Sequence, residues 1–198
     1  MLQAASDALC AHLETVLANR SAAVTAEPPL VPVTAPPDGV GAERGIGVHL
    51  FHVAALDQGR GADAVDVRDE QGRVIGRRPP VNRYRTRWLL WSWALTAQER
   101  LELLDVALAL LTARPVLPEA AAGADLIAGG PVQVDAAPAL GTAGELGGVF
   151  AGLKVPSRPA LEIVLTAGLV LPVERVAGPP TDLRVTTHPR RTLPYDTN

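Results

Sequence analysis

The stretch of residues 77–119 constrains the fold of this chain more than any other part of the sequence. It begins with a double proline, continues as an alternating segment that holds all three tryptophans, and ends in a leucine-rich helix pattern closed by Arg114 and Pro115. Proline disfavours the helical conformation in the residue before it, so the double proline predicts an extended entry. Thr96 and Glu99 have the spacing of a capping box, which predicts a helix directly after Thr96. We therefore expect a long strand that leads straight into a core helix.

Alternation along residues 81–95 gives the expected strand two different faces. One face holds Tyr84, Thr86, Trp88 and Leu90. The other face begins with Arg83, Arg85 and Arg87 and turns apolar at Leu89, Trp91 and Trp93. A strand with this pattern is expected to leave the body of the domain at its arginine end.

The helix expected at residues 97–113 has a broad apolar arc. One face is marked by Leu101, Leu104, Leu108 and Leu111, and it is widened by Leu103, Val106 and Leu110. Such an arc is typical of a helix that is buried against a sheet.

Periodicity and turn residues predict the remaining elements. An amphipathic helix is expected at residues 2–20 and a weaker, glycine-containing helix at residues 143–153. Strands are expected at residues 46–55, 132–135, 160–171 and 173–177, and a hairpin at residues 64–68 and 73–76. Residues 30–33 suit only an edge strand, because Pro32 cannot donate a ladder hydrogen bond.

The expected organisation is one domain over residues 1–178, followed by an extended arm over residues 179–198. The chain has 198 residues, of which 47% are hydrophobic and only 4% aromatic, so Leu, Val and Ala must fill most of one sizeable core. Four prolines between residues 179 and 194 deny regular structure to the arm.

Charge and composition exclude several classes. A formal net charge of −3 gives no bulk attraction to nucleic acid or to an anionic membrane. No apolar stretch approaches the roughly 20 residues of a membrane span, and the first residues lack the basic region of a signal peptide. A cytoplasmic location is therefore expected. The lone Cys10 excludes an internal disulfide framework and a cysteine-based zinc site.

No motif in the sequence predicts catalysis. His49 and His52 are expected on opposite faces of a strand, where they cannot share a metal ion. The glycines between residues 39 and 47 precede a strand instead of following one, so they do not predict a phosphate loop. We therefore expect no catalytic residue, no metal and no cofactor.

The arginine stripe of Arg83, Arg85 and Arg87 leaves three interpretations open. It can be a solvated surface, a contact for an acidic protein partner, or a nucleic-acid platform. The third is disfavoured because alternation puts Tyr84 and Trp88 on the opposite face. The partner interface expected from the sequence comprises Arg83, Arg85, Arg87, Arg184, Arg190 and Arg191.

Several segments recur together in one known family. They are Gly-Val-His-Leu-Phe-His-Val at residues 47–53, Arg-Pro-Pro at residues 78–80, the long strand, the leucine-rich helix and Arg-Pro-Val-Leu at residues 114–117. In this order they resemble the cap, or tube-terminator, proteins of phage-tail-like extracellular contractile injection systems. The resemblance spans most of residues 2–178.

The resemblance implies an α/β fold of the α+β type, with helices packed on a mixed, largely antiparallel sheet, as in phage tail terminators. It also implies a structural protein instead of an enzyme: a hexameric ring at the distal end of a particle, which ends the inner tube and joins the last sheath layer. The implied partners are further copies of the chain, the inner tube protein and the sheath protein, which the arm could reach by strand addition. Such a protein acts in the cytoplasm of the producing bacterium as part of an assembled particle. The alternatives are an adaptor or baseplate-like component of a related phage-tail-like particle, a nucleic-acid-binding module, or an enzyme of unknown type.

Overall fold

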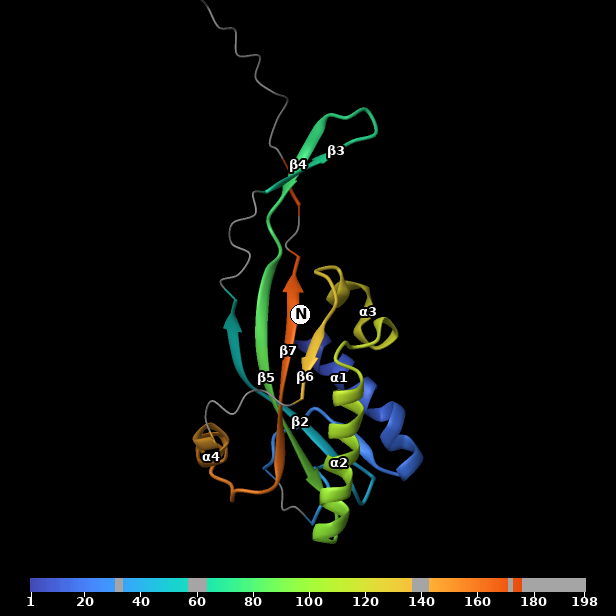
Figure 1. Ribbon diagram of the computed structural model, residues 1–198, viewed down its shortest axis with the longest axis vertical. Helices are drawn as coiled ribbons and strands as arrows, with labels where there is room; N and C mark the ends of the chain where they lie inside the picture. Colours follow the sequence, from blue (N-terminus) through green and yellow to red (C-terminus); the bar gives the residue numbers. More distant parts are fainter. Residues whose placement is uncertain (31–33, 57–63, 137–142, 171–172, 176–198) are drawn as a thin grey trace, which may run out of the picture.

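A five-stranded sheet forms the centre of the molecule in the computed structural model, which describes residues 1–30, 34–56, 64–136, 143–170 and 173–175 (Figure 1). Its strands are, in spatial order, β1 (Ala23–Thr25), β2 (Gly45–Ala55), β5 (Asn82–Trp93), β7 (Ala160–Leu169) and β6 (Gln133–Asp135). Only β1 and β2 are parallel, and the other neighbours are antiparallel. The predicted α+β class with a mixed, largely antiparallel sheet is confirmed.

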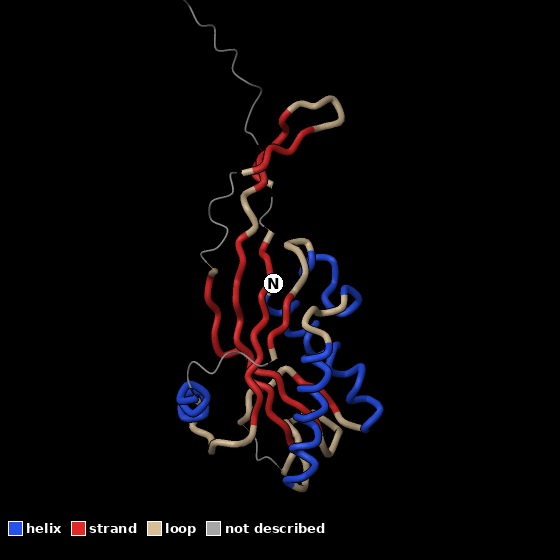
Figure 2. The backbone as a smooth tube through the Cα atoms, in the orientation of Figure 1, coloured by secondary structure: helices blue, strands red, loops and turns tan. Residues whose placement is uncertain are grey.

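Three helices cover one side of the sheet, namely α1 (Leu2–Leu17), α2 (Ala97–Ala113) and α3 (Glu119–Ile127) (Figures 1 and 2). A short 3-10 turn, Ala18–Arg20, continues α1. The fourth helix, α4 (Ala143–Gly152), lies apart from these three, on the other side of the strands (Figure 1). The helices predicted at residues 2–20, 97–113 and 143–153 are confirmed as α1, α2 and α4. Helix α3 was not predicted.

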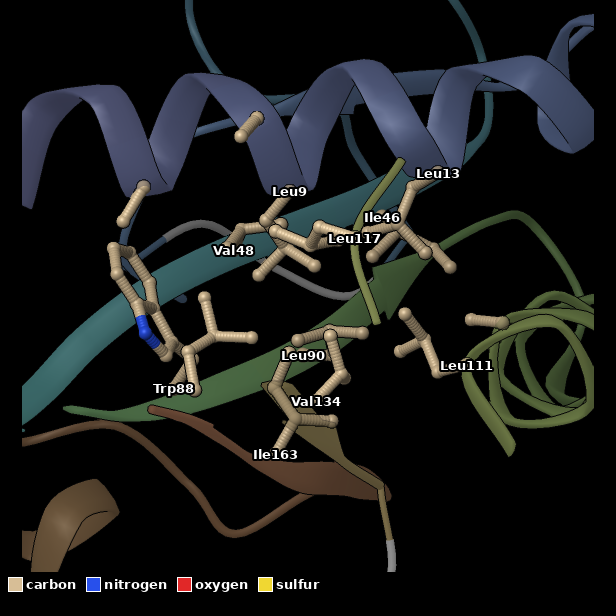
Figure 3. Packing of buried hydrophobic residues seen from close by; sticks show 14 of the residues in the cluster. Leu9, Leu13, Ile46, Val48, Trp88, Leu90, Leu111, Leu117, Val134 and Ile163 are labelled. Carbon is tan, nitrogen blue, oxygen red and sulfur yellow. The ribbon is translucent and has the colours of Figure 1, made fainter. Parts of the chain in front are cut away.

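The main core lies between the sheet and the three helices (Figure 3). Leu9 and Leu13 of α1 lie next to Val48 and Ile46 of β2. Leu90 of β5 and Ile163 of β7 continue the same layer. The contributing residues of a strand alternate along the chain, as in Ile46, Val48 and Leu50 of β2, because the strand period is two.

A second, smaller apolar layer lies on the opposite face of the sheet. It includes Leu89, Trp91, Trp93, Phe150 and Val164, which are buried outside the main cluster. The tryptophan indoles lie over glycines of β2, since a Cβ at Gly47 would be 2.1 Å from Trp91 Nε1. The two indole N–H groups donate to the backbone carbonyls of Glu27 (2.9 Å) and Ala42 (3.3 Å). The segment before β2 therefore covers this face.

The predicted capping box of α2 is confirmed. The backbone N–H of Glu99 donates to Thr96 Oγ1 at 3.2 Å, and the backbone N–H of Thr96 donates to Glu99 Oε2 at 3.1 Å. The first turn is also tied to the end of β5. Ser92 Oγ of β5 donates to the carbonyl of Arg100 at 3.0 Å, and the Arg100 side chain donates to the carbonyl of Ala94, the residue after β5, at 2.8 Å.

The predicted buried face of α2 is partly wrong. The buried residues are Leu103, Leu104, Ala107 and Leu111. Leu101 is 54% exposed and Leu108 is half-buried. The apolar arc is wider than the face that the sheet can cover, and the tie of the first turn to β5 fixes which part of it turns inward.

The prediction that His49 and His52 occupy opposite faces is also wrong. A β-bulge lies between Leu50 and His52, so His49 pairs with Leu89 and His52 pairs with Arg87. Leu89 and Arg87 are two residues apart on β5 and share a face, so both histidines lie on that face as well. The extra residue, Phe51, reverses the alternation of the rest of β2.

The predicted hairpin forms a separate sheet at one end of the molecule (Figures 1 and 2). It pairs β3 (Val65–Arg68) with β4 (Val74–Arg78), and β4 also pairs with β8 (Glu174–Arg175). Asp69 closes the turn, because its Oδ1 accepts hydrogen bonds from the backbone N–H groups of Gln71 and Arg73.

Some predictions fall outside the described residues. The edge strand expected at residues 30–33 does so for residues 31–33, and the arm at residues 179–198 does so completely. The edge strand next to β2 is β1, and this strand was not predicted.

Candidate functional site

The arginine stripe has the arrangement that alternation predicted. Arg83, Arg85 and Arg87 share one face of β5. Their neighbours on β7 are Gly168, Thr166 and Val164. Arg83 and Arg85 are exposed, whereas only 20% of the Arg87 side chain is exposed. The structure thus divides the stripe into two exposed arginines and one partly buried arginine.

Arg87 is held by two groups on neighbouring strands. Its Nε donates to Glu162 Oε1 at 2.6 Å, and its guanidinium lies 5.2 Å from the centroid of the Phe51 ring. Charge-assisted hydrogen bonds and cation–π contacts are strengthened when the groups are partly desolvated. Arg87 therefore stabilises the sheet, and Arg83 and Arg85 are the arginines of the stripe that a partner can reach.

The surface around Arg83 and Arg85 is polar. His52 of β2 is exposed and pairs with Arg87. Gln133 and Asp135 of β6 lie on the same face, because they pair with Thr166 and Val164 of β7. A cationic, hydrogen-bonding surface of this kind suits an acidic protein surface. Arg184, Arg190 and Arg191, which the sequence analysis added to the interface, lie outside the described residues.

Trp88 of β5 does not join this surface. Trp88 is 2% exposed within the main core, where its indole N–H donates to Thr86 Oγ1 at 2.8 Å. Single-stranded nucleic acid is bound by aromatic faces next to a cationic groove. Trp88 is thus not accessible to a base, and the half-buried Phe51 ring already packs against Arg87 at 5.2 Å, so the geometry favours a protein partner.

Two titratable side chains of α1 face the core: His12 is buried and Cys10 is half-buried. Burial, with Glu14 and Asp7 nearby, raises the pKa of Cys10 to about 11, so its thiol stays protonated at neutral pH. Burial and then the charge of Arg114 lower the pKa of His12. Within the described ranges, no three His, Cys, Asp or Glu side chains are grouped so that they could hold a metal ion.

An open groove of about 800 Å³ lies between α2 and the start of β7. It is lined by Gln98, Leu101, Glu102, Leu104, Asp105, Leu108, Pro159, Ala160 and Leu161. We call this surface the α2 groove. The groove was not predicted from the sequence. The apolar arc of α2 indicated it, because the arc contains more leucines than the sheet can cover.

The hairpin end of the molecule also exposes apolar side chains. Val65 is 65% exposed, Ile75 is 51% exposed and Val74 is 38% exposed. The same strands carry Arg68, Arg77 and Arg78, all exposed. These features form a second surface that sequence reasoning did not single out.

Among the helices in the described part of the chain, none is both long and apolar enough to cross a bilayer.

The chain matches a protein-family model and several solved structures. The family model described as the Pvc16 N-terminal domain matches residues 6–183. No curated protein sequence matches the chain significantly.

Two solved structures share the fold. One is the PVC sheath/tube terminator of an extracellular contractile injection system in the extended state, with a TM-score of 0.67, 18% identity and 98% of this chain covered. The other is the anti-feeding prophage cap, a tube-terminating cap, with a TM-score of 0.59, 17% identity and 96% of this chain covered. The chain spans 65% of the length of the first protein and 59% of the length of the second.

Proposed function

Because the chain belongs to the Pvc16 N-terminal domain family, we propose that it caps the sheath and inner tube of an extracellular contractile injection system. The observation that carries the proposal is the extent of the fold match, which includes nearly the whole chain and involves two proteins that terminate such tubes. A match of this extent means that the main sheet and the hairpin end both belong to the shared architecture.

A cap of this kind would act as a ring of six copies. In a closed ring each subunit uses one surface to bind a different surface of its neighbour, and rotation closes the set. A ring that offers the tube a matching surface on one side only would stop further addition of tube subunits. Copies of the chain, the inner tube protein and the sheath protein are thus the proposed partners.

Arg83 and Arg85 are the proposed contact with an acidic surface of the tube or sheath. They are exposed on a strand whose other half is buried on both faces, so the sheet holds them rigidly. Residues 179–198, with Arg184, Arg190 and Arg191, are proposed as an arm that binds a neighbouring sheath or cap subunit by strand addition.

Electron microscopy of particles from cells that lack the protein tests the proposal. We expect sheathed particles to be lost or tubes to reach uncontrolled lengths, and expression of the wild-type chain should restore particle number and length. Particles of normal length with an intact distal end would refute the cap function.

A further inference from the structure

The α2 groove and the hairpin both expose apolar surface that the folded chain leaves uncovered. Leu101 is 54% exposed at the groove, and Val65 is 65% exposed on the hairpin. Core packing in the single chain does not account for either residue, because neither belongs to a buried cluster. Exposed apolar residues that gather beside charged ones mark interaction sites.

The hairpin needs a further partner for physical reasons. Two-stranded hairpins are at best marginally stable in water. In the part of the chain that the structure describes, the third strand, β8, consists of Glu174–Arg175. Register places Val65 and Val74 on opposite faces, because Val74 pairs with Arg68, which lies three residues after Val65 on β3. A ribbon with apolar side chains on both faces is covered better by a groove than by a flat surface.

Charge distinguishes the two surfaces. The α2 groove carries the carboxylates of Glu102 and Asp105 at its rim. Strands β3 and β4 and their turn contain four arginines, at positions 68, 73, 77 and 78, against three carboxylates, at positions 66, 69 and 70. Opposite charge across an interface directs association and fixes which surfaces meet.

The two surfaces cannot meet within one molecule. Figure 1 shows the hairpin at one end of the long axis, while α2 runs into the opposite end. Contact between them therefore requires two molecules arranged head to tail, and such a contact generates a ring when its rotation closes.

We infer that the hairpin of one copy of this chain docks in the α2 groove of the next copy, with the arginines at the end of β4 near Glu102 and Asp105 of the neighbour. The inference rests on the proposed ring, whose contact between subunits it specifies. The leucines of the α2 groove then cover the exposed apolar side chains of the hairpin.

Two charge-reversed variants of the full chain test the docking. The groove variant carries Glu102→Arg and Asp105→Arg, and the hairpin variant carries Arg77→Glu and Arg78→Glu. The exposed ion pair of Arg77 with Asp66 (3.2 Å) contributes little to folding, so its loss should leave the hairpin intact. A matched control reverses Asp7 and Glu14, which are exposed on α1.

Sedimentation velocity over a range of concentrations measures self-association. We expect the wild-type chain and the control to associate, and each variant alone to associate at least about tenfold more weakly because like charges would meet. An equimolar mixture of the two variants should recover association, since each reversed groove then meets a reversed hairpin in an alternating assembly. Recovery also shows that both variants are folded.

Three outcomes overturn the inference: a wild-type chain that stays monomeric at every concentration, variants that associate like the wild type, or a mixture that does not recover. Association that the groove variant retains would mean that another component covers the groove. The particle-length experiment is independent of these results, so a failed docking contact and a failed cap function can be told apart.

Discussion

Arg87 shows at the scale of one residue that the three arginines of the stripe have different roles. Its contacts with Glu162 and Phe51 predict that Arg87→Met lowers the free energy of unfolding by about 1–3 kcal/mol, because the half-buried Glu162 carboxylate loses its charged partner. Denaturant titration measures the change. The matched variant Arg85→Met removes an exposed charge and should stay within about 0.5 kcal/mol of the wild type. Equal effects of the two variants would contradict the division of the stripe.

At the same scale, the burial of His12 predicts how the free energy of unfolding depends on pH. Its side chain is 0% exposed, and neither ring nitrogen has a hydrogen bond to a residue that the structure describes. Burial lowers the pKa of His12 in the folded state, so the unfolded chain binds the proton more readily. The sign is thus fixed: the free energy of unfolding falls as pH drops below the unfolded pKa of about 6.5, by at most about 1.4 kcal/mol per pH unit for one proton.

Unfolding at several pH values between 7 and 5 tests this linkage. His12→Leu removes the titrating group, so its stability should change less over that range than the stability of the wild type. If the two curves run parallel, His12 does not carry the effect.

At the scale of elements, the close packing of β2 on β5 makes Gly47 sensitive to substitution. A Cβ there would lie 2.1 Å from Trp91 Nε1, so Gly47→Ala must displace the indole. We expect a loss of about 1–3 kcal/mol, as for other overpacked cores, and a change in tryptophan fluorescence. Gly147→Ala in α4 is the matched control, because its Cβ meets nothing within 4 Å and alanine favours a helix. Similar losses from both would show that glycine flexibility, and not packing, is responsible.

The elements also show where sequence reasoning succeeds. The strand–helix unit of β5 and α2 was predicted because its signals are local: alternation, a capping box at Thr96 and a closing Arg114-Pro115. Helix α3 was missed because it is short, has no side-chain cap and contains Gly123 at a φ of 72°.

Other features depend on contacts that no local pattern contains. The bulge at Phe51 arises from pairing with β5 and reverses the expected faces of His49 and His52. The inward face of α2 depends on its tie to the end of β5, so the sequence predicted the width of the apolar arc but not which leucines form the groove. The stripe was placed correctly, yet the partner that separates Arg87 from Arg85 lies far along the chain, on β7.

The whole molecule has three candidate contact surfaces: the stripe, the α2 groove and the hairpin. Their positions on different elements suit a ring subunit, which needs two different surfaces for its neighbours and further surface for the tube or sheath. If the groove and hairpin join neighbouring copies, Arg83 and Arg85 remain available for another protein.

This assignment predicts that Arg83→Glu with Arg85→Glu blocks assembly of sheathed particles while the purified chain still folds and self-associates. Both side chains are exposed, so reversal should leave thermal unfolding nearly unchanged, while like charges at an acidic partner surface weaken binding. Electron microscopy of particles from cells that express the variant provides the measurement. Arg20→Glu with Lys154→Glu changes the net charge equally at exposed sites elsewhere and should assemble normally. Normal particles with the stripe variant would remove Arg83 and Arg85 from the interface, and loss of self-association would place them between copies of the chain instead.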